Sequence, residues 1–354
     1  MLKNILTVLC LAFTASVQGQ TAPESRPKEV STVFSVRHPD AIERMDENPA
    51  VTRRMVNELI LAFTGKKDLA GAWGSLVQPK DRVGIKVSAA GGRYFSSHPG
   101  VVEAIIEGLA AAGIPRTQII VWDRDLNRLN AAQFNQKRGG YQLRSITGVN
   151  DYDRNAVFLA PILGKLIWGD VLFSEKQKRP FNHKVNEGDL LSSSSYIANV
   201  LSRQVTKVIN VPVLSDEPSC GVAGALYNIT VPNVDNWRRF LQSDHSGGES
   251  IAALYADEHV GPKVVINIMD GLIAQYANGP DGNGNYSFAH RTLYASSDPV
   301  ALDATALNLI EAWRVEAKLP PIGARAEWLQ TATELGLGNC ESSRIQIKEI
   351  PSSK

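Results

Sequence analysis

Three aspartates in the last third of the chain lie beside predicted regular elements. Asp270 follows the apolar, β-branched run from Val264 to Met269, which predicts a buried strand. Asp298 is predicted to be the N-cap of a helix, and Asp303 lies in the first turns of the same helix. Open α/β sheets bind ligands at strand ends and helix starts, so we expect these carboxylates to belong to a site. There they would hold a metal ion or act as general acid and base.

Two of these aspartates also have a purely structural interpretation. Asp298 is most economically an N-cap, because Asp is among the favoured capping residues. Asp303 is surrounded by apolar residues, which implies burial, yet an acid early in a helix is favoured by the helix dipole. The sequence leaves both interpretations open.

A lysine, a histidine and an asparagine complete the set of candidate residues. Lys86 lies inside the apolar strand Val83–Val87, where an unpaired ammonium is costly, so we expect it to pair with one of the aspartates or to bind an anionic substrate. His98 precedes a proline and either starts a helix or contacts substrate. Asn228 follows a segment of small residues that lets the backbone approach a ligand closely.

A divalent metal ion is one hypothesis for the cofactor. Asp244 with His245 and Asp257 with His259 carry side chains that can bind metal, although such pairs are more often solvated surface residues. The helical His-Glu-x-x-His signature is absent. The glycine-rich segment 281–285 fails the calcium-loop pattern, and we interpret it as an active-site loop or a surface turn.

Other enzyme classes lack their signatures in this sequence. No phosphate-binding loop or dinucleotide-binding fingerprint is present, and no Gly-x-Ser-x-Gly elbow supports a serine hydrolase. Cys220 and Cys340 are the cysteines outside the N-terminal segment, so an iron–sulfur cluster held by four cysteines is not expected. In an oxidising compartment these two cysteines either form one disulfide or stay unpaired.

The elements that must position these residues are those of an α/β domain. A strand at 83–87, a helix from His98-Pro99 to Gly113 and an apolar run at 118–122 predict a βαβ unit and hence parallel strand pairing. Further buried strands are predicted at 206–211 and 264–269. We expect a mixed, largely parallel sheet flanked by helices, in a single domain over residues 49–354 with an inserted, partly antiparallel region at 139–205.

The N-terminus predicts export from the cell. Residues 1–19 combine one lysine, an apolar core and small residues before Gln20, which is typical of a secretory signal peptide. Residues 20–48 are predicted to form a flexible N-terminal segment, the lead, before the domain. Cleavage would leave 36 basic and 36 acidic residues, because Lys3 is one of 37 basic residues and no acid is lost. This balance gives no support to nucleic-acid or membrane-surface binding, so we expect a secreted or periplasmic protein.

Several segments between residues 80 and 320 resemble, in the same order, those of the DUF362 family: VGIKV, HPGVVEAIIEGLAAAGI, VINVPVL with GVAGALYN, NIMDGLIAQYANGP and SSDPVALDA. The activity of that family is poorly defined, and some relatives carry iron–sulfur modules. Two lysines common in the family are missing, because this chain has Ser215-Asp216-Glu217 and Tyr227 at the corresponding places. This chain retains the family's residues at Lys86, Asn228, Asp270, Asp298 and Asp303.

The leading hypothesis is therefore an enzyme, or an enzyme-like protein, that binds a small polar or anionic ligand. Its catalytic residues would be Lys86, Asp270 and Asp303, and its substrate-binding residues Asn228, Asp298 and His98. The alternative is a non-catalytic periplasmic binding protein descended from an enzyme, which the two missing lysines favour.

Overall fold

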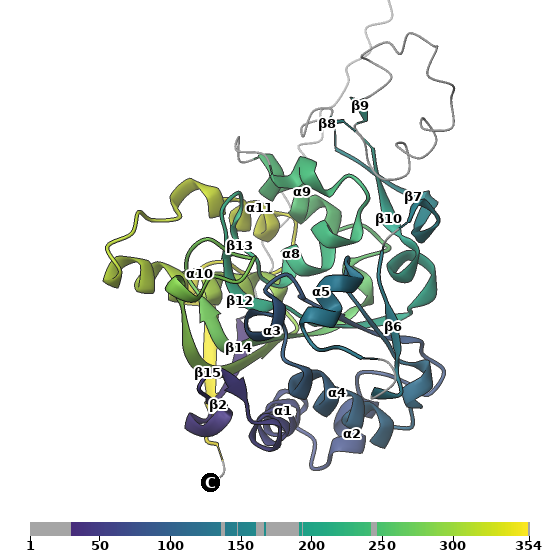
Figure 1. Cartoon of the computed structure of the whole chain (residues 1–354), viewed down its shortest axis with the longest axis vertical. Coiled ribbons are helices and arrows are strands. Elements are labelled where there is room, and N and C mark those ends of the chain that lie inside the picture. The colour runs from purple at the N-terminus through teal and green to yellow at the C-terminus, as the bar shows by residue number, and fades with distance from the viewer. Residues whose placement is uncertain are drawn as a thin grey trace, which may run out of the picture.

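The computed structural model describes residues 30–135, 139–146, 148–160, 166–167, 191–192, 194–241 and 246–352. At its centre lies a ten-stranded sheet (Figure 1). Its strands, in spatial order, are β16 (Ile345–Ile350), β1 (Ser31–Arg37), β15 (Ser287–Ser296), β14 (Val264–Gln275), β11 (Lys207–Val211), β4 (Val83–Val87), β5 (Ile120–Trp122) and β6 (Gln142–Arg144), with β12 (Val213–Glu217) beside β14 and β13 (Gly221–Val222) beside β12.

Most pairings in this sheet are parallel, as the βαβ pattern predicted. The run β14–β11–β4–β5–β6 is parallel throughout, and β12 also pairs in parallel with β14. The pairs β1–β15 and β14–β15 are antiparallel. The fold is thus α/β with a mixed, largely parallel sheet.

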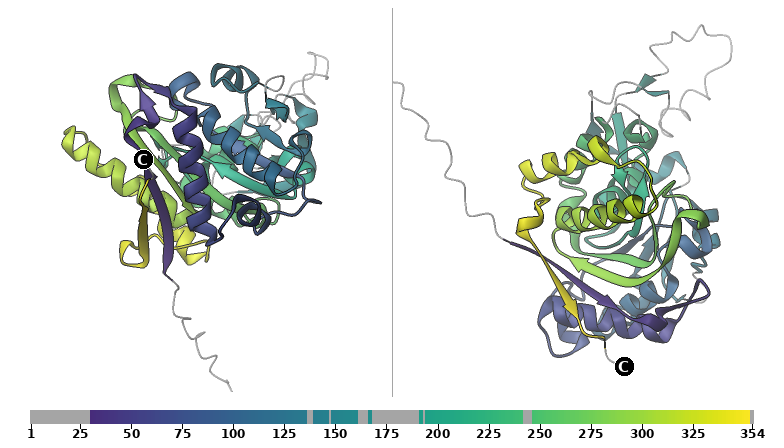
Figure 2. Two further views of the ribbon diagram at one scale, coloured as in Figure 1. Left: turned by 90° about the horizontal axis from the view of Figure 1, so that it is seen from below. Right: turned by 90° about the vertical axis from the view of Figure 1, so that its left-hand side faces the viewer.

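Helices cover both faces of the sheet, which explains why its central strands are apolar at nearly every position. One face carries α1 (Pro49–Thr64), α2 (Leu69–Gly74) and α4 (Pro99–Ala111), and the other carries α8 (Ala225–Thr230), α9 (Ser246–Tyr255), α10 (Pro299–Glu316) and α11 (Trp328–Glu334) (Figures 1 and 2). Strand β4 is buried at all five positions. Its Val83, Ile85 and Val87 belong to the core under α1 and α4, so the alternating side chain of Lys86 points to the α8 face.

Two predicted boundaries were wrong. The lead predicted at 20–48 contains β1, which pairs with β15 on one side and β16 on the other, because Val33 and Val36 bury their side chains on opposite faces of the sheet. The strand predicted at 264–269 continues to Gln275. Asp270 therefore lies inside β14, where β12 and β15 pair on both sides of it.

The region predicted as an insertion is divided in the structure. Strand β6 joins the main sheet, whereas β7 (Tyr152–Leu159) and β10 (Ser194–Ala198) form a separate antiparallel ribbon. The two short strands β8 (Leu166–Ile167) and β9 (Leu191–Ser192) pair with each other. The predicted signal peptide lies outside the described residues.

Two smaller helices, α3 (Gly92–Phe95) and α5 (Leu126–Ala131), follow β4 and β5. Strands β2 (Ile42–Glu43) and β3 (Asp46–Glu47) form a short hairpin before α1. Within the part of the chain that the structure describes, the helices are too short or too polar to cross a lipid bilayer.

Helix α4 packs against α2 through a position where only glycine fits. A Cβ added at Gly108 would lie 1.9 Å from Nε1 of Trp73, a buried side chain of α2. We expect Gly108→Ala to lower the free energy of unfolding by about 1–3 kcal/mol through overpacking, despite the higher helix propensity of Ala. Urea unfolding measures this loss. The control is Gly74→Ala, whose Cβ meets nothing within 4 Å; equal stability of the two variants would contradict the packing argument.

Candidate functional site

A pocket of about 600 Å³ opens beyond the carboxyl ends of β4 and β5. Its wall includes Ser88 and Asp123, which directly follow these strands, together with Tyr227 and Asn228 from α8. In open α/β sheets, ligands bind at this edge. The position alone therefore makes the pocket the leading site candidate.

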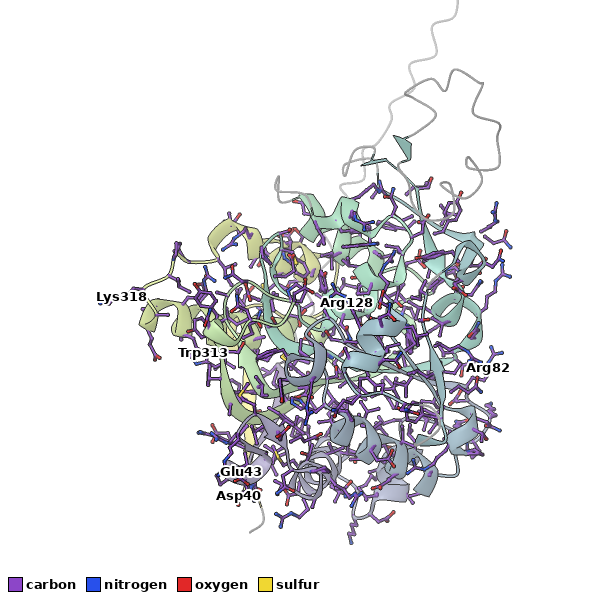
Figure 3. The ribbon with its side chains drawn as sticks, viewed as in Figure 1. Asp40, Glu43, Arg82, Arg128, Trp313 and Lys318 are labelled. Carbon is purple, nitrogen blue, oxygen red and sulfur yellow. The ribbon has the colours of Figure 1, made fainter. Side chains whose placement is uncertain are left out.

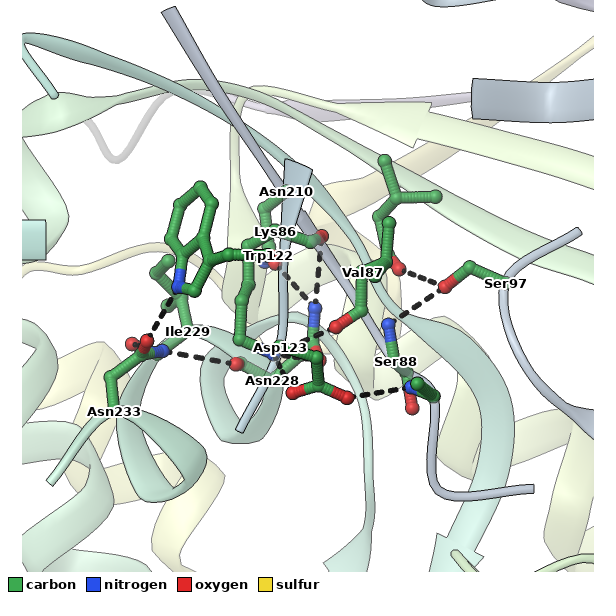
Figure 4. A network of polar contacts seen from close by, with 12 residues as sticks. Lys86, Val87, Ser88, Ser97, Trp122, Asp123, Asn210, Asn228, Ile229 and Asn233 are labelled. Carbon is green, nitrogen blue, oxygen red and sulfur yellow. Dashed lines mark hydrogen bonds and ion pairs between the residues drawn. The ribbon is translucent and has the colours of Figure 1, made fainter. Parts of the chain in front are cut away.

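A buried ammonium lies directly beneath the pocket wall (Figure 4). Nζ of Lys86 donates to Oδ1 of Asp123 at 2.8 Å, to the carbonyl of Val87 at 2.7 Å and to Oδ1 of Asn228 at 3.1 Å. These three acceptors match the three protons of an ammonium group. Burial lowers the pKa of Lys86, and the Asp123 carboxylate opposes that effect. Lys86 thus holds Asp123 and Asn228 in place and does not itself face the pocket.

The network extends from Asn228 across the sheet. Its Nδ2 donates to Oδ1 of Asn210 at 2.8 Å, and Nδ2 of Asn210 donates to Oδ1 of Asn267 at 2.9 Å. These amides lie on β11 and β14, so three parallel strands and α8 share one chain of hydrogen bonds. Because buried polar groups need partners, this chain fixes the position of α8 over the sheet.

Asp123 was missed as a candidate from the sequence. It follows β5 immediately, and the same strand-end argument that selected Asp270 would have selected it. Only 6% of the residue is exposed, and Oδ2 accepts from the backbone N–H of Ala89 at 2.7 Å. Both oxygens are therefore oriented, while the carboxylate still lines the pocket.

Three arginines surround the mouth of the pocket. Arg124 and Arg238 lie over the ring of Trp237, at 5.2 and 4.4 Å from its centroid. Arg128, on α5, donates to Asp281 at 2.5 Å and so joins α5 to the loop between β14 and β15 (Figure 3). The entrance is thus lined by guanidinium groups, which suit carboxylate and phosphate groups geometrically.

The residues that replace the two family lysines lie near this pocket. Tyr227 lines it, and burial raises the pKa of its phenol well above the usual value, so the hydroxyl is neutral. Asp216 accepts from the N–H of Gly279 at 2.9 Å, and burial raises the pKa of its carboxyl to about 6. Glu217 accepts from the N–H groups of Ser219 and Cys220, both at 2.7 Å. The two acids therefore hold loops next to the site.

Asp270 and His98 form a separate buried pair. Oδ2 of Asp270 accepts from the backbone N–H of His98 at 2.7 Å and contacts its Nδ1 at 2.9 Å. Burial disfavours the imidazolium, but the Asp270 carboxylate outweighs burial, and the pKa of His98 is raised above its usual value. The pair ties β14 to the start of α4, and neither residue lines the pocket.

Asp303 and Asp298 cap helices. The Asp303 carboxylate, fully buried, accepts from the N–H groups of Ala225 at 2.5 Å and Leu226 at 3.0 Å, the first two residues of α8. Asp298 is the N-cap of α10, as predicted, and accepts from the N–H of Ala301 at 2.8 Å. Neither residue lines the pocket. Of the predicted site residues, Asn228 lines it and Lys86 lies beneath its wall.

The structure provides no metal centre among the residues it describes, since no three His, Cys, Asp or Glu side chains gather closely enough to hold an ion. Asp244 and His245 lie outside those residues. Asp257 and His259 bind each other, with Oδ1 and Nδ1 2.8 Å apart.

Cys220 and Cys340 are free thiols, so of the two alternatives for these cysteines the unpaired one is observed.

Asp303 leads to a prediction about pH. Burial raises its pKa from 3.8 to about 7, so the folded state binds a proton that the unfolded state has already released. This contribution to stability is complete below pH 3.8 and is lost as the pH rises through about 7. We expect the unfolding midpoint in urea to fall over this window in the wild-type protein and to fall less in Asp303→Asn. Parallel pH profiles for the two proteins would contradict the assignment.

Of the comparisons with known proteins, the family comparison agrees with the motifs. The family described as "Domain of unknown function (DUF362)" matches residues 169–308. No curated protein matches the chain. A crystal structure of a protein from Thermotoga maritima, a structural genomics target, is similar at 13% identity with a TM-score of 0.40. The match covers 78% of this chain and 61% of the other, so the chain spans less than two thirds of that protein.

The matched region contains Asn228, Asp270, Asp298 and Asp303, whereas Lys86 precedes it. Residues 169–308 of the chain thus match the model of the DUF362 family, in agreement with the resemblance of its motifs.

Proposed function

We propose that the pocket beyond β4 and β5 binds a small polar molecule that carries an anionic group, and that Asp123 acts on this ligand as a general acid or base. The observation that carries the proposal is the oriented Asp123 carboxylate in the wall of a pocket whose mouth carries three arginines. Pockets of this volume, with a few well-placed polar groups, are typical of small-molecule sites.

The lining carries three arginines and three aspartates, and Arg238 is the arginine that favours an anion. The three carboxylates are each engaged within the protein: Asp123 binds Lys86, Asp125 caps α5 by accepting from the N–H of Arg128 at 2.9 Å, and Asp281 binds Arg128. The exposed Arg238 has its guanidinium over Trp237, which holds it at the entrance without neutralising it. A carboxylate or phosphate group would supply the matching negative charge.

The surroundings of Asp123 support acid–base chemistry. Lys86 and the N–H of Ala89 fix the two carboxylate oxygens, yet each oxygen has a second lone pair that can accept a ligand hydroxyl or ammonium. Tyr227 and Asn228 add neutral hydrogen-bonding groups on the same wall. In this arrangement Lys86 is a positioning residue, and Asp123 is the group that would touch the ligand.

A non-catalytic binding protein is the second candidate. The Lys86–Asp123–Asn228 network is fully satisfied within the protein, and a purely structural role for it explains the same contacts. Under this alternative the arginines and Tyr227 bind the ligand, and nothing in the pocket changes it chemically.

Titration calorimetry with inorganic phosphate, malonate and citrate tests binding. We expect at least one of these anions to bind the wild-type protein, and Arg238→Gln to weaken binding about tenfold, the effect of losing one charge-assisted hydrogen bond. Arg54→Gln, which removes an exposed arginine on α1, is the matched control and should bind like the wild type. Absence of binding, or equal weakening in both variants, would reject the site.

Proton NMR of malonate or citrate over time, followed through their CH2 signals, separates the two candidates. Conversion by the wild-type protein but not by Asp123→Asn supports acid–base catalysis. Binding without conversion supports the non-catalytic alternative.

The buried ion pair itself predicts a loss of stability. Lys86→Met leaves the Asp123 carboxylate without its counter-charge, and we expect the free energy of unfolding to fall by about 3 kcal/mol. Adding Asp123→Asn removes the uncompensated charge and should restore part of the loss. Urea unfolding of both variants, with the exposed Lys66→Met as control, measures the effect. A double variant no more stable than Lys86→Met would argue against the ion pair as the cause.

A further inference from the structure

A second pocket, of about 640 Å³, lies at the opposite end of the sheet from the first. Its floor is the outer part of the sheet, β16, β1 and β15, and α10 forms one wall. We propose that this pocket binds an uncharged, polyhydroxylated ligand of the size of a mono- or disaccharide. The inference does not depend on the function proposed for the first pocket.

The register of the three strands builds the floor. Ser35 on β1 is paired with Tyr294 on β15 and with Glu349 on β16, so all three side chains project to the same face. Arg37 and Thr292 form the next pair on that face. Since successive side chains alternate, Val36 and Leu293 point to the other face and belong to the core under α1.

Helix α10 supplies the wall with polar and apolar groups side by side. Thr305, Asn308 and Leu309 are spaced three and four residues apart, which places them on one stripe of the helix above the floor. Ser342 and Ile345 continue the lining where the chain enters β16. The pocket therefore alternates neutral hydrogen-bonding groups with aliphatic surface.

The pocket is close to electrically neutral. His290 contacts the hydroxyl of Tyr294 through Nε2 at 2.8 Å, and burial lowers its pKa to about 4, so the imidazole is uncharged at neutral pH. Burial also raises the pKa of Tyr294 to about 12. Arg37 and Glu349 are the charged residues of the lining, and their charges have opposite signs. An anion or cation would gain little here, whereas hydroxyl groups would find donors and acceptors.

Two aromatic rings, those of His290 and Tyr294, line the pocket, and two more pack against them or beside them. The rings of His290 and Tyr294 are stacked, with centroids 6.0 Å apart and planes 10° apart. Trp313 of α10 packs edge-on against His290 at 5.1 Å and against Phe288 at 4.9 Å, and it lies at the surface of the molecule (Figure 3). A sugar ring has an apolar C–H face that packs against such surfaces and a rim of hydroxyls that bonds to Ser, Thr and Asn side chains.

Titration calorimetry of the full chain with glucose, N-acetylglucosamine, maltose and cellobiose tests the proposal. Asn308 is exposed on α10, so Asn308→Trp fills the pocket without disturbing the core. We expect at least one sugar to bind the wild-type protein and the Glu316→Gln control, which changes an exposed residue of the same helix outside the pocket. Binding by Asn308→Trp should be at least about tenfold weaker.

Three outcomes would overturn the proposal: no sugar binds, Asn308→Trp binds sugar as tightly as the wild type, or Arg238→Gln at the first pocket weakens sugar binding instead. Unfolding midpoints of each variant in urea show whether a loss of binding reflects loss of the fold. Failure of sugar binding with anion binding intact would leave the function proposed for the first pocket unaffected.

Discussion

The buried Lys86 ammonium is the constraint around which the ligand-facing edge of the sheet is arranged. A charge in this position is tolerated only if every proton finds an acceptor and a counter-charge lies beside it. Asp123 supplies the counter-charge, and the Val87 carbonyl and Asn228 complete the set. The register that pairs Lys86 with Trp122 on β5 brings Asp123, the next residue, within reach. Asn228 must come from α8, so the helix and the strands depend on one another.

The position of α8 is determined from both of its ends. Asp303 accepts from the first two N–H groups of the helix, and no Cβ fits at Gly224, where it would lie 2.0 Å from Oδ1 of Asp303. Further along, Asn228 is held by Lys86 and by the amide chain through Asn210 and Asn267. Asp303, which does not line the pocket, thus helps to orient Asn228 in the pocket wall. This explains how Asp303 can matter for a site without lining it.

The motifs predicted the α/β class, the βαβ unit and the family, because these depend on local periodicity and on short segments. Residues 83–87 form the predicted strand, and the helix predicted from His98-Pro99 to Gly113 forms as α4. The candidate residues were chosen by the same local rules; of these, Asn228 lines the pocket and binds Lys86, which lies beneath the pocket wall. Asp270, Asp298 and Asp303, predicted as site residues, do not line this pocket. They bind partners as far as 172, 267 and 78 positions away, and such separations cannot be read from the sequence.

By itself the sequence determined that Lys86 lies in an apolar strand and needs an anionic partner, either an acid of the protein or an anionic substrate, because an unpaired buried ammonium is costly. Only the tertiary structure decided which acid. Parallel pairing places β5 beside β4, so Asp123 binds Lys86, whereas Asp270 lies inside β14 and Asp303 inside α10. The second pocket likewise arises only where β16, β1 and β15, from opposite ends of the chain, pair in register beneath α10. Local patterns specify which side chains need partners, and strand pairing over long sequence separations selects them.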